Sequence, residues 1–268
     1  MRRTSRVYYI GMIASDKYGK IVGEHAFSGA SARKMRTVVE ALRWVGQQAI
    51  FVSLPPACRT ARWPFHRTVV TRDGGAPAIF LATARSRILR KILGSLFLAN
   101  FARRSIQSRD DVIVYNHALE YLPALIVLRL RGVKVIQDIE DAPVTSVSSV
   151  REILGRTAFW LTSSLTDKRK MVVSESVAQR LSLSDYVAVP GVASLALPQS
   201  DERKWKDLHE EQGVLKIHYG GTLIADTGVD LFCQAVQRLA ESNDRLARRI
   251  EFQVTGVGDF GKLRRLQK

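Results

Sequence analysis

Short apolar runs alternate with segments of helical periodicity along most of this 268-residue chain. Parallel strands need a crossover of a dozen or more residues, and a helix usually supplies it. The alternation therefore predicts an α/β fold with a parallel sheet wrapped by helices. The expected strands are 7–13, 49–53, 68–70, 112–115, 133–139, 171–174, 186–189 and 250–254, and the expected helices are 31–45, 85–104, 122–131, 151–165 and 175–183.

A second unit of the same kind begins late in the chain. The apolar run 215–219 is expected to stop at the glycine pair 220–221, and a short loop leads through a helix cap at 226–227 into a helical pattern over 229–239. A strand, a glycine turn and a helix whose N-terminus faces an anion open a Rossmann-like unit. Two such domains in tandem place a cleft between them, and we expect the function there.

The domain boundaries follow from composition. Residues 196–213 are more polar and contain the charged run 201–206, which is typical of an interdomain linker. We expect a first Rossmann-like domain at 1–195 and the start of a second at 214–268. A doubly wound domain needs roughly twice the residues that remain after the linker, so the second domain is expected to be incomplete, as in a fragment or a truncated product.

The chain is strongly basic, with 41 Lys and Arg against 25 Asp and Glu and a formal net charge of +16. Such a charge favours an anionic partner, which could be a membrane surface, a nucleic acid or a phosphorylated ligand. A nucleic acid is the least favoured of the three, because the charge is dispersed and no RNA-stacking motif accompanies it. Neither the two cysteines nor the histidines have metal-ligand spacing, so we expect a cytoplasmic protein without a metal site.

The helix expected at 85–104 carries an apolar stripe surrounded by arginines and lysines. A basic amphipathic helix of this kind can lie in a membrane interface with its cations on lipid phosphates. It can equally be a crossover helix with a solvated basic side. The stripe consists of Ile88, Leu89, Ile92, Leu93, Leu96 and Phe97.

Polar side chains follow two of the expected strands. Open α/β sheets bind ligands at the carboxyl ends of their strands, so these positions are candidates for a site. The alternative for the acidic residues 138–141 is that they cap the following segment, and the alternative for His117 is that it lies in an exposed loop. The residues are Asp138, Glu140 and Asp141 after one strand, and Asn116, His117 and Glu120 after another.

Four places, taken in order along the chain, carry a resemblance to a known family. They are 28–30 before the first helix, 111–117, 171–181 with 189–192, and 219–223 with 227–235 and 254–258. In their joint order and spacing they resemble family 4 of the retaining GT-B glycosyltransferases, which builds bacterial surface polysaccharides and glycolipids. The likeness covers nearly the whole chain and implies two Rossmann-like domains, the second for the nucleotide-sugar.

This resemblance implies transfer of a hexosyl-type sugar from a nucleotide-diphosphate-sugar to a hydroxyl acceptor, with retention and without a metal or cofactor. Backbone N–H groups at glycine turns and a helix N-terminus would stabilise the departing diphosphate. Thr222 and Thr227 stand where the family commonly has an Arg and a Lys, and they could bind a phosphate without neutralising it. The expected donor-phosphate residues are Gly29, Gly220, Gly221, Thr222, Thr227, Gly228 and Gly256.

On the acceptor side, the family's histidine near the reacting sugar aligns with Glu140. We therefore expect Glu140 and Asp141 to be catalytic, and Asn116, His117 and Glu120 to bind the acceptor. The acceptor would be lipid-linked or a saccharide, at the inner face of a membrane, with peripheral contact through 85–104. The alternative is a truncated, non-catalytic remnant that binds a membrane or a partner protein.

Overall fold

The computed structural model of the chain describes residues 5–12, 18–19, 30–55, 65–73, 75–143, 150–189, 215–223, 229–242 and 250–258. The chain divides into two compact units, Met1–Leu195 and Ala196–Lys268. The expected donor residues Gly29, Thr227 and Gly228 lie outside the described residues.

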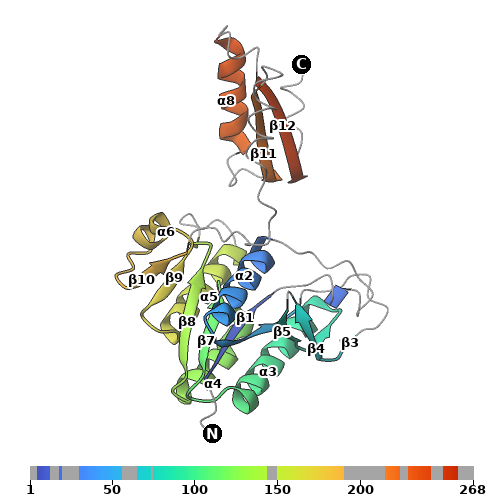
Figure 1. Cartoon of the computed structure of the whole chain (residues 1–268), viewed down its shortest axis with the longest axis vertical. Helices are drawn as coiled ribbons and strands as arrows, with labels where there is room; N and C mark the ends of the chain where they lie inside the picture. Colours follow the sequence, from blue (N-terminus) through green and yellow to red (C-terminus); the bar gives the residue numbers. More distant parts are fainter. Residues whose placement is uncertain are drawn as a thin grey trace. The chain divides into compact units, whose positions relative to one another are not determined.

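The first unit is built on an eight-stranded sheet (Figure 1). All neighbouring strands are parallel except the last pair, in which β4 runs antiparallel to β5. In spatial order they are β10 (Tyr186–Ala188), β9 (Lys170–Val172), β8 (Lys134–Ile139), β7 (Asp111–Tyr115), β1 (Arg6–Gly11), β2 (Gln48–Ser53), β5 (Ala76–Phe80) and β4 (Val69–Asp73). A short antiparallel pair joins β3 (Phe65–His66) to β6 (Thr83–Ala84).

The winding direction of the sheet reverses beside β1. The chain moves outward from β1 to β2 and β5, and then returns to β7 and continues the other way to β8, β9 and β10. The central strand β1 is paired on both sides, with Tyr8 opposite Ile50 of β2 and Val112 of β7. In open α/β sheets, ligands bind beyond the carboxyl ends of the strands at such a reversal. The fold thus places the strand ends of β1, β7 and β8 where a site is expected.

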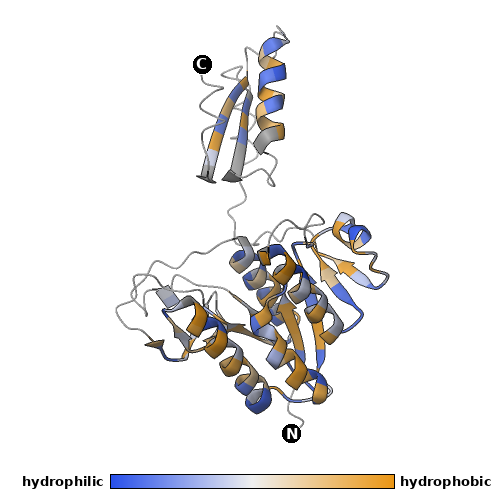
Figure 2. Ribbon diagram, turned by 180° about the vertical axis from the view of Figure 1, so that it is seen from behind, coloured by the Kyte–Doolittle hydropathy of each residue, from blue (hydrophilic) through white to orange (hydrophobic). Residues whose placement is uncertain are grey.

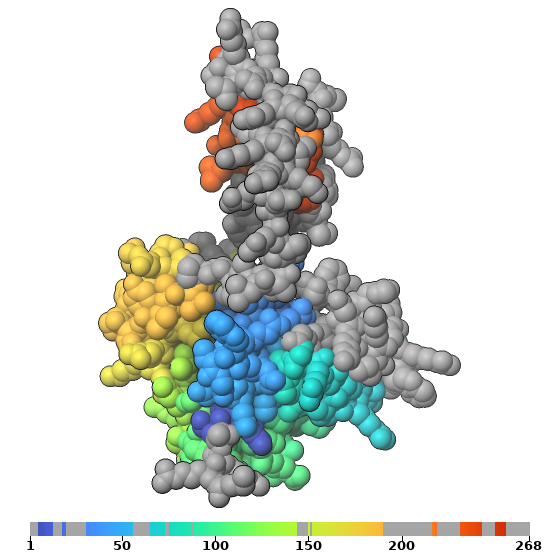
Figure 3. Space-filling view, viewed as in Figure 1, coloured from blue at the N-terminus to red at the C-terminus, as the bar shows by residue number. Residues whose placement is uncertain are grey.

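Helices cover both faces of this sheet. They are α2 (Ala30–Trp44), α3 (Arg87–Ser105), the 3-10 turn η1 (Leu119–Tyr121), α4 (Leu122–Leu130), α5 (Val150–Leu165) and α6 (Glu175–Arg180). Side chains alternate along β1, so that Tyr9 packs in the core with Met35 of α2, and Tyr8 packs in the core with Leu98 of α3. The space-filling view shows α2 at the surface between the β9–β10 region and strands β4 and β5 (Figure 3).

The helix ends were predictable from glycine. The helix α2 is followed by Gly46 with φ 83°, and α4 is followed by Gly132 with φ 67°. Both glycines were predicted to close these helices, and the left-handed conformation at this place is the reason that glycine is favoured there.

One strand of the sheet was missed. The sequence predicted a single short strand at 68–70 in this region, whereas the structure has β4 and also β5, which contains Pro77. Proline cannot donate to a strand ladder and is uncommon inside strands. The ladder between β5 and β2 begins at Ala78, one residue after the proline, and so Pro77 interrupts no bond on that side.

The helix α3 confirms the helix predicted at 85–104, but much of its apolar stripe does not face the core. Gly94, Leu98 and Ala102 are the buried residues of this helix. Five members of the predicted stripe are exposed at 38% to 71%, namely Ile88, Leu89, Ile92, Leu96 and Phe97. The view from behind shows hydrophobic residues over much of the helices on this face (Figure 2). Among the described helices, none is both long enough and apolar enough to cross a bilayer.

The second unit has two parallel strands, β11 (Leu215–Leu223) and β12 (Ile250–Gly258), joined through α8 (Val229–Glu241). The prediction that the first of these strands stops at Gly220 was wrong, because β11 continues to Leu223, and β12 likewise runs past Val254 to Gly258. The glycines do not end the strands, because the backbone pairing continues in one register through Gly221 and Gly256 to Leu223 and Gly258.

Candidate functional site

Charged and hydrogen-bonding side chains meet at the carboxyl ends of β1, β7 and β8. We call them the carboxyl-edge cluster. Its members are Tyr9, Lys34, Tyr115, Asn116, Asp138, Glu140 and Asp141. Four of these residues were predicted as site residues or as part of the acidic group, and three, Tyr9, Lys34 and Tyr115, were not.

The centre of the cluster is a buried ion pair. The Lys34 ammonium lies 2.9 Å from Asp138 Oδ1 and 3.1 Å from Glu140 Oε2. Lys34 is 5% exposed and Asp138 is fully buried. Asp138 also accepts a hydrogen bond from the Tyr9 hydroxyl on its other oxygen. A buried carboxylate needs such partners, because charges are strongly disfavoured in the interior unless they are paired and hydrogen-bonded.

Asn116 ties the ends of β7 and β8 together. Its side-chain oxygen accepts from the backbone N–H of Glu140 at 2.7 Å and from that of Asp141 at 3.2 Å. Its amide nitrogen donates to Asp141 Oδ2 at 3.1 Å. Asn116 has φ 54°, a left-handed conformation that asparagine tolerates better than most residues. Asn116 therefore fixes the conformation of the loop that carries the Glu140 and Asp141 carboxylates.

Glu140 is the carboxylate of the cluster that combines firm support with access. The Tyr115 hydroxyl donates to its Oε2 at 2.8 Å, the same oxygen that Lys34 contacts, and the side chain is 26% exposed. Among the described residues Oε1 has no hydrogen bond, so this oxygen is able to accept one from a ligand. Asp141 is exposed beside it. A fixed carboxylate of this kind can orient a hydroxyl group or remove its proton.

The two tyrosines act as neutral donors. Burial, the hydrogen bond to Glu140 and the nearby carboxylates raise the pKa of Tyr115, and burial together with the charge of Asp138 raises the pKa of Tyr9 well above its ordinary value. Both phenols therefore keep their protons at neutral pH and donate them in hydrogen bonds to the carboxylates.

His117 and Glu120, the other two predicted acceptor residues, lie apart from these hydrogen bonds. The His117 ring packs edge-on against Phe159 with centroids 5.4 Å apart, and within the described part of the chain its buried Nδ1 has no hydrogen-bond partner. Burial lowers the pKa of His117, and the charge of Asp141 offsets this in part. Glu120 pairs with Lys91 at 3.6 Å. The histidine is therefore held neutral against α5.

Of the predicted donor residues, Gly220, Gly221, Thr222 and Gly256 lie within β11 and β12 and not in turns. Gly221 and Gly256 face each other across the ladder near the carboxyl ends of both strands. A glycine pair leaves the backbone of both strands open to close approach. In the described part of the chain, no group of three or more His, Cys, Asp or Glu side chains could hold a metal ion.

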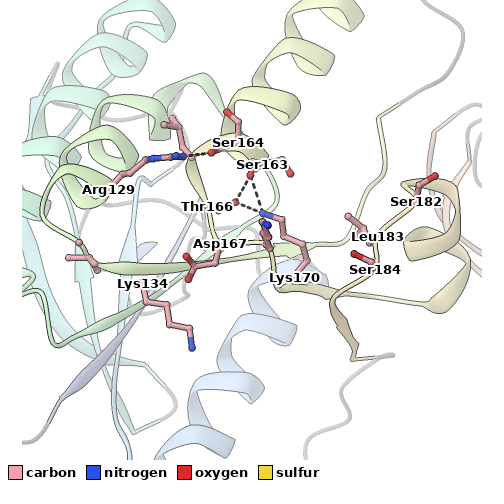
Figure 4. Close-up of a pocket in the computed structure, with 14 residues that line it drawn as sticks. Arg129, Lys134, Ser163, Ser164, Thr166, Asp167, Lys170, Ser182, Leu183 and Ser184 are labelled. Carbon is pink, nitrogen blue, oxygen red and sulfur yellow. Dashed lines mark hydrogen bonds between the residues drawn. The ribbon is translucent and has the colours of Figure 1, made fainter.

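A hollow of about 790 Å³ lies at the end of the sheet away from the carboxyl-edge cluster, where β8 and β9 begin (Figure 4). Two of its cations, Lys170 and Arg129, bind the end of α5. The buried Lys170 ammonium donates to the Ser163 carbonyl at 3.1 Å and to Thr166 Oγ1 at 2.6 Å, and Arg129 donates to the Ser164 carbonyl. These contacts satisfy C-terminal carbonyls of a helix, so a structural role accounts for them.

No known protein family matches this sequence, and no curated protein matches it. Solved structures match it in fold. An α,α-trehalose-phosphate synthase (UDP-forming) from Burkholderia vietnamiensis aligns over 98% of this chain and 67% of its own, with 14% identity and a TM-score of 0.57. A trehalose-6-phosphate synthase aligns over the same shares with 13% identity and a TM-score of 0.60. The E. coli enzyme bound with UDP-2-fluoro glucose gives 11% identity, 98% and 67% coverage, and a TM-score of 0.56.

At these identities the likeness concerns the fold. The prediction of an α/β chain with Rossmann-like units of the GT-B type is confirmed, and the chain spans about two thirds of the length of the structures that it matches. Membership of family 4 and retention at the anomeric carbon stay predictions.

Proposed function

We propose that this chain is a glycosyltransferase that moves a sugar from a nucleotide-diphosphate-sugar to a hydroxyl acceptor. The observation that carries the proposal is the buried, ion-paired carboxylate cluster at the reversal point of a parallel sheet. The fold is shared with UDP-forming trehalose-phosphate synthases, one of them bound with a UDP-sugar analogue. Hexosyl transfer with retention, without a metal or cofactor, is the form of the reaction that we propose.

Glu140 is the proposed acceptor-activating group. Its Oε1 accepts a hydrogen bond from the hydroxyl group of the acceptor sugar, while Lys34 and Tyr115 hold Oε2 in place. Positioning of this kind reduces the entropy loss of the reaction and fixes the hydroxyl for attack. Asp141 and Asn116 lie beside Glu140, and we propose that they contact neighbouring hydroxyls of the acceptor. His117 and Glu120, which follow β7 in the sequence, are proposed as further acceptor contacts.

The donor diphosphate is assigned to the glycine-containing segments. Negative charge develops on the departing diphosphate, and backbone N–H groups stabilise it without a metal. We propose Gly29, Gly220, Gly221, Thr222, Thr227, Gly228 and Gly256 for this role. The pairing of Gly221 with Gly256 supports it, because a ladder without side chains admits a ligand close to the backbone.

The test is a calorimetric titration of the full chain with UDP-glucose and related nucleotide-sugars, followed by a transfer assay. We expect saturable donor binding, and we expect Glu140→Gln to lower turnover by about 100-fold or more while donor binding remains. Asp185→Asn is the matched control, because that carboxylate is exposed and pairs only with surface Arg169 in the described structure. A chain that binds no nucleotide-sugar would remove the proposal.

We further propose a role in surface polysaccharide or glycolipid synthesis, with a lipid-linked acceptor and peripheral contact with the inner face of a membrane. The support is an exposed apolar surface that extends beyond α3, since α4 packs against both α3 and α5. We call it the outer apolar face. It consists of Ile88, Leu89, Ile92, Leu96 and Phe97 of α3, Ile126 and Leu130 of α4, and Val150, Ile153, Leu154, Trp160 and Leu161 of α5.

The charge on these helices matches an anionic bilayer. The sequences of α3 and α4 contain no acidic residue, and α5 contains one, Glu152. Arginine and lysine residues lie along α3, whereas α4 has one arginine, Arg129, and α5 has two, Arg151 and Arg156. Exposed apolar side chains in such number are typical of an interaction surface, and cations on the same helices favour anionic lipid headgroups.

Flotation with vesicles of phosphatidylcholine and phosphatidylglycerol tests the membrane contact. The triple variant Ile88→Ser, Ile92→Ser, Leu96→Ser should lose most vesicle binding and keep its thermal midpoint, because these side chains are exposed. Equal flotation of both proteins would contradict the contact. If vesicles bind and nucleotide-sugars do not, the alternative is favoured, in which the chain is a non-catalytic membrane-binding or partner-binding protein.

A further inference from the structure

The outer apolar face has a direction relative to the strands of the sheet. The helix α3 lies between β5 and β7 in the chain, and α5 lies between β8 and β9. Helices that connect parallel strands run back from the carboxyl end of one strand to the amino end of the next. For α5 the backbone shows this directly, because Asp167, just after the helix, donates its N–H to the carbonyl of Val135 near the start of β8. The first turns of α3 and α5 therefore lie toward the carboxyl ends of the strands, as the carboxyl-edge cluster does.

The exposed apolar side chains of these two helices gather at the same end. The first six residues of α3 contain three of them, and the first six of α5 contain another three. The last six residues of α3 contain none, and those of α5 contain two. The outer apolar face is thus densest beside the proposed acceptor site. The six side chains are Ile88, Leu89 and Ile92 of α3, and Val150, Ile153 and Leu154 of α5.

The 3-10 turn η1 connects this surface to the carboxyl-edge cluster. It packs against both α3 and α5, and its Leu119 is exposed. The next residue, Glu120, pairs with Lys91 of α3 at 3.6 Å. Three residues before Leu119, Asn116 accepts hydrogen bonds from the loop that carries Glu140. One short stretch of chain therefore leads from the acceptor site to exposed apolar side chains.

The charge at this end suits an anionic bilayer. The Lys91 side chain is 49% exposed, and Arg85 is exposed just before α3. Apolar side chains of this kind enter the membrane interface while neighbouring cations bind lipid headgroups. A lipid-linked acceptor stays in the bilayer, because removing it would expose its whole chain to water. A site for such an acceptor must therefore lie at the bilayer surface.

We infer that the chain docks on an anionic bilayer with the end of the outer apolar face that lies beside η1, so that the acceptor enters the site from the bilayer surface. This inference rests on the proposed function, because it gives the proposed membrane contact an orientation and names the acceptor class, an amphiphile that remains anchored in the bilayer. The opposite end of the face, where α4 ends at Leu130, then contributes little to docking.

The test compares two single variants of the full chain in flotation with vesicles of phosphatidylcholine and phosphatidylglycerol. Ile88 is 71% exposed in the first turn of α3, and Leu130 is 83% exposed at the end of α4. We expect Ile88→Ser to lower vesicle affinity about tenfold, because one large apolar side chain is lost from the interface. The matched control Leu130→Ser should lower it less than about twofold. Both variants should keep the native thermal midpoint, since both side chains are exposed.

Hydrogen exchange with and without the same vesicles gives a second measurement. Backbone N–H groups in the first turn of a helix lack intrahelical partners, so they report a new cover. We expect vesicles to slow exchange at 86–92 and 116–121 and to leave 126–132 unchanged. Slower exchange at 126–132 alone overturns the orientation, and so does a loss of affinity in Leu130→Ser that equals or exceeds the loss in Ile88→Ser.

The proposed transfer is tested separately by calorimetry with nucleotide-sugars. If a nucleotide-sugar binds but the two variants lose affinity equally, the orientation is overturned and the proposed transfer stands. A native chain that does not float with vesicles overturns the orientation together with the membrane contact. If neither vesicles nor nucleotide-sugars bind, the inference and the proposed function are both overturned.

Discussion

Lys34 is a single buried ammonium that serves two carboxylates, Asp138 and Glu140. Replacing it by methionine leaves Asp138 buried without its cation, and breaking a buried pair in this way typically costs about 3 kcal/mol or more. We expect Lys34→Met to lower the free energy of unfolding, measured in urea, by that amount. The exposed neighbour Arg33→Met should change it by less than about 0.5 kcal/mol.

The double variant Lys34→Met, Asp138→Asn separates charge from packing. Removing the carboxylate as well should restore part of the lost stability, because no unpaired charge then remains inside. A loss of less than about 1 kcal/mol in Lys34→Met alone would contradict the buried ion pair.

His117 predicts an acid-dependent loss of stability. Burial lowers its pKa in the folded chain below the ordinary value, so the unfolded chain takes up the proton first as the pH falls. The contribution of the neutral ring is complete above about pH 6.5 and declines below it, by at most about 1.4 kcal/mol per pH unit. His117→Gln should flatten this part of the curve of unfolding free energy against pH. A parallel curve for the variant would show that His117 does not titrate in this way.

The strand ends predicted four of the seven residues of the cluster. Asn116, Asp138, Glu140 and Asp141 could be predicted because polar residues at the ends of apolar strands gather at one edge of a parallel sheet. Lys34 could not be assigned, although it has helical spacing to Val38 on the buried side of α2, because a helical pattern does not say what its cation meets. Its partner Asp138 lies 104 residues away, and only the sheet order brings the two together.

Some helix and strand boundaries follow from the local sequence, and others depend on pairing with distant segments. The ends of α2 and α4 followed from Gly46 and Gly132, whose conformation is a local property. The strand β5 was missed because its place between β2 and β4 depends on pairing with distant segments. The exposed stripe of α3 was also beyond the sequence, because periodicity gives the apolar face of a helix but not its direction.

The C-terminal end of α5 gives a prediction at basic pH. Burial lowers the pKa of Lys170 to about 8, and so between about pH 8 and its ordinary pKa near 10.5 the unfolded chain binds more protons than the folded one. The folded chain should therefore gain stability over this range relative to Lys170→Gln, by about 1 kcal/mol after allowance for solvent screening. Paired urea titrations at pH 7.5, 9 and 10.5 measure the difference. A constant difference would contradict the lowered pKa.

The whole molecule combines a net charge of +16 with the outer apolar face, and salt separates their effects. Binding that rests on dispersed charge alone is screened, because the Debye length falls from about 10 Å at 0.1 M salt to about 3 Å at 1 M. Apolar insertion into a bilayer is not weakened by salt in this way. We expect anionic vesicles to retain a measurable part of their affinity at 0.5 M NaCl, and single-stranded DNA to lose nearly all of its own. The serine triple variant of α3 should respond to salt on vesicles as the native chain does on DNA. If vesicle binding by the native chain vanishes at the same salt concentration as DNA binding, charge alone accounts for it, and the outer apolar face has no part in docking.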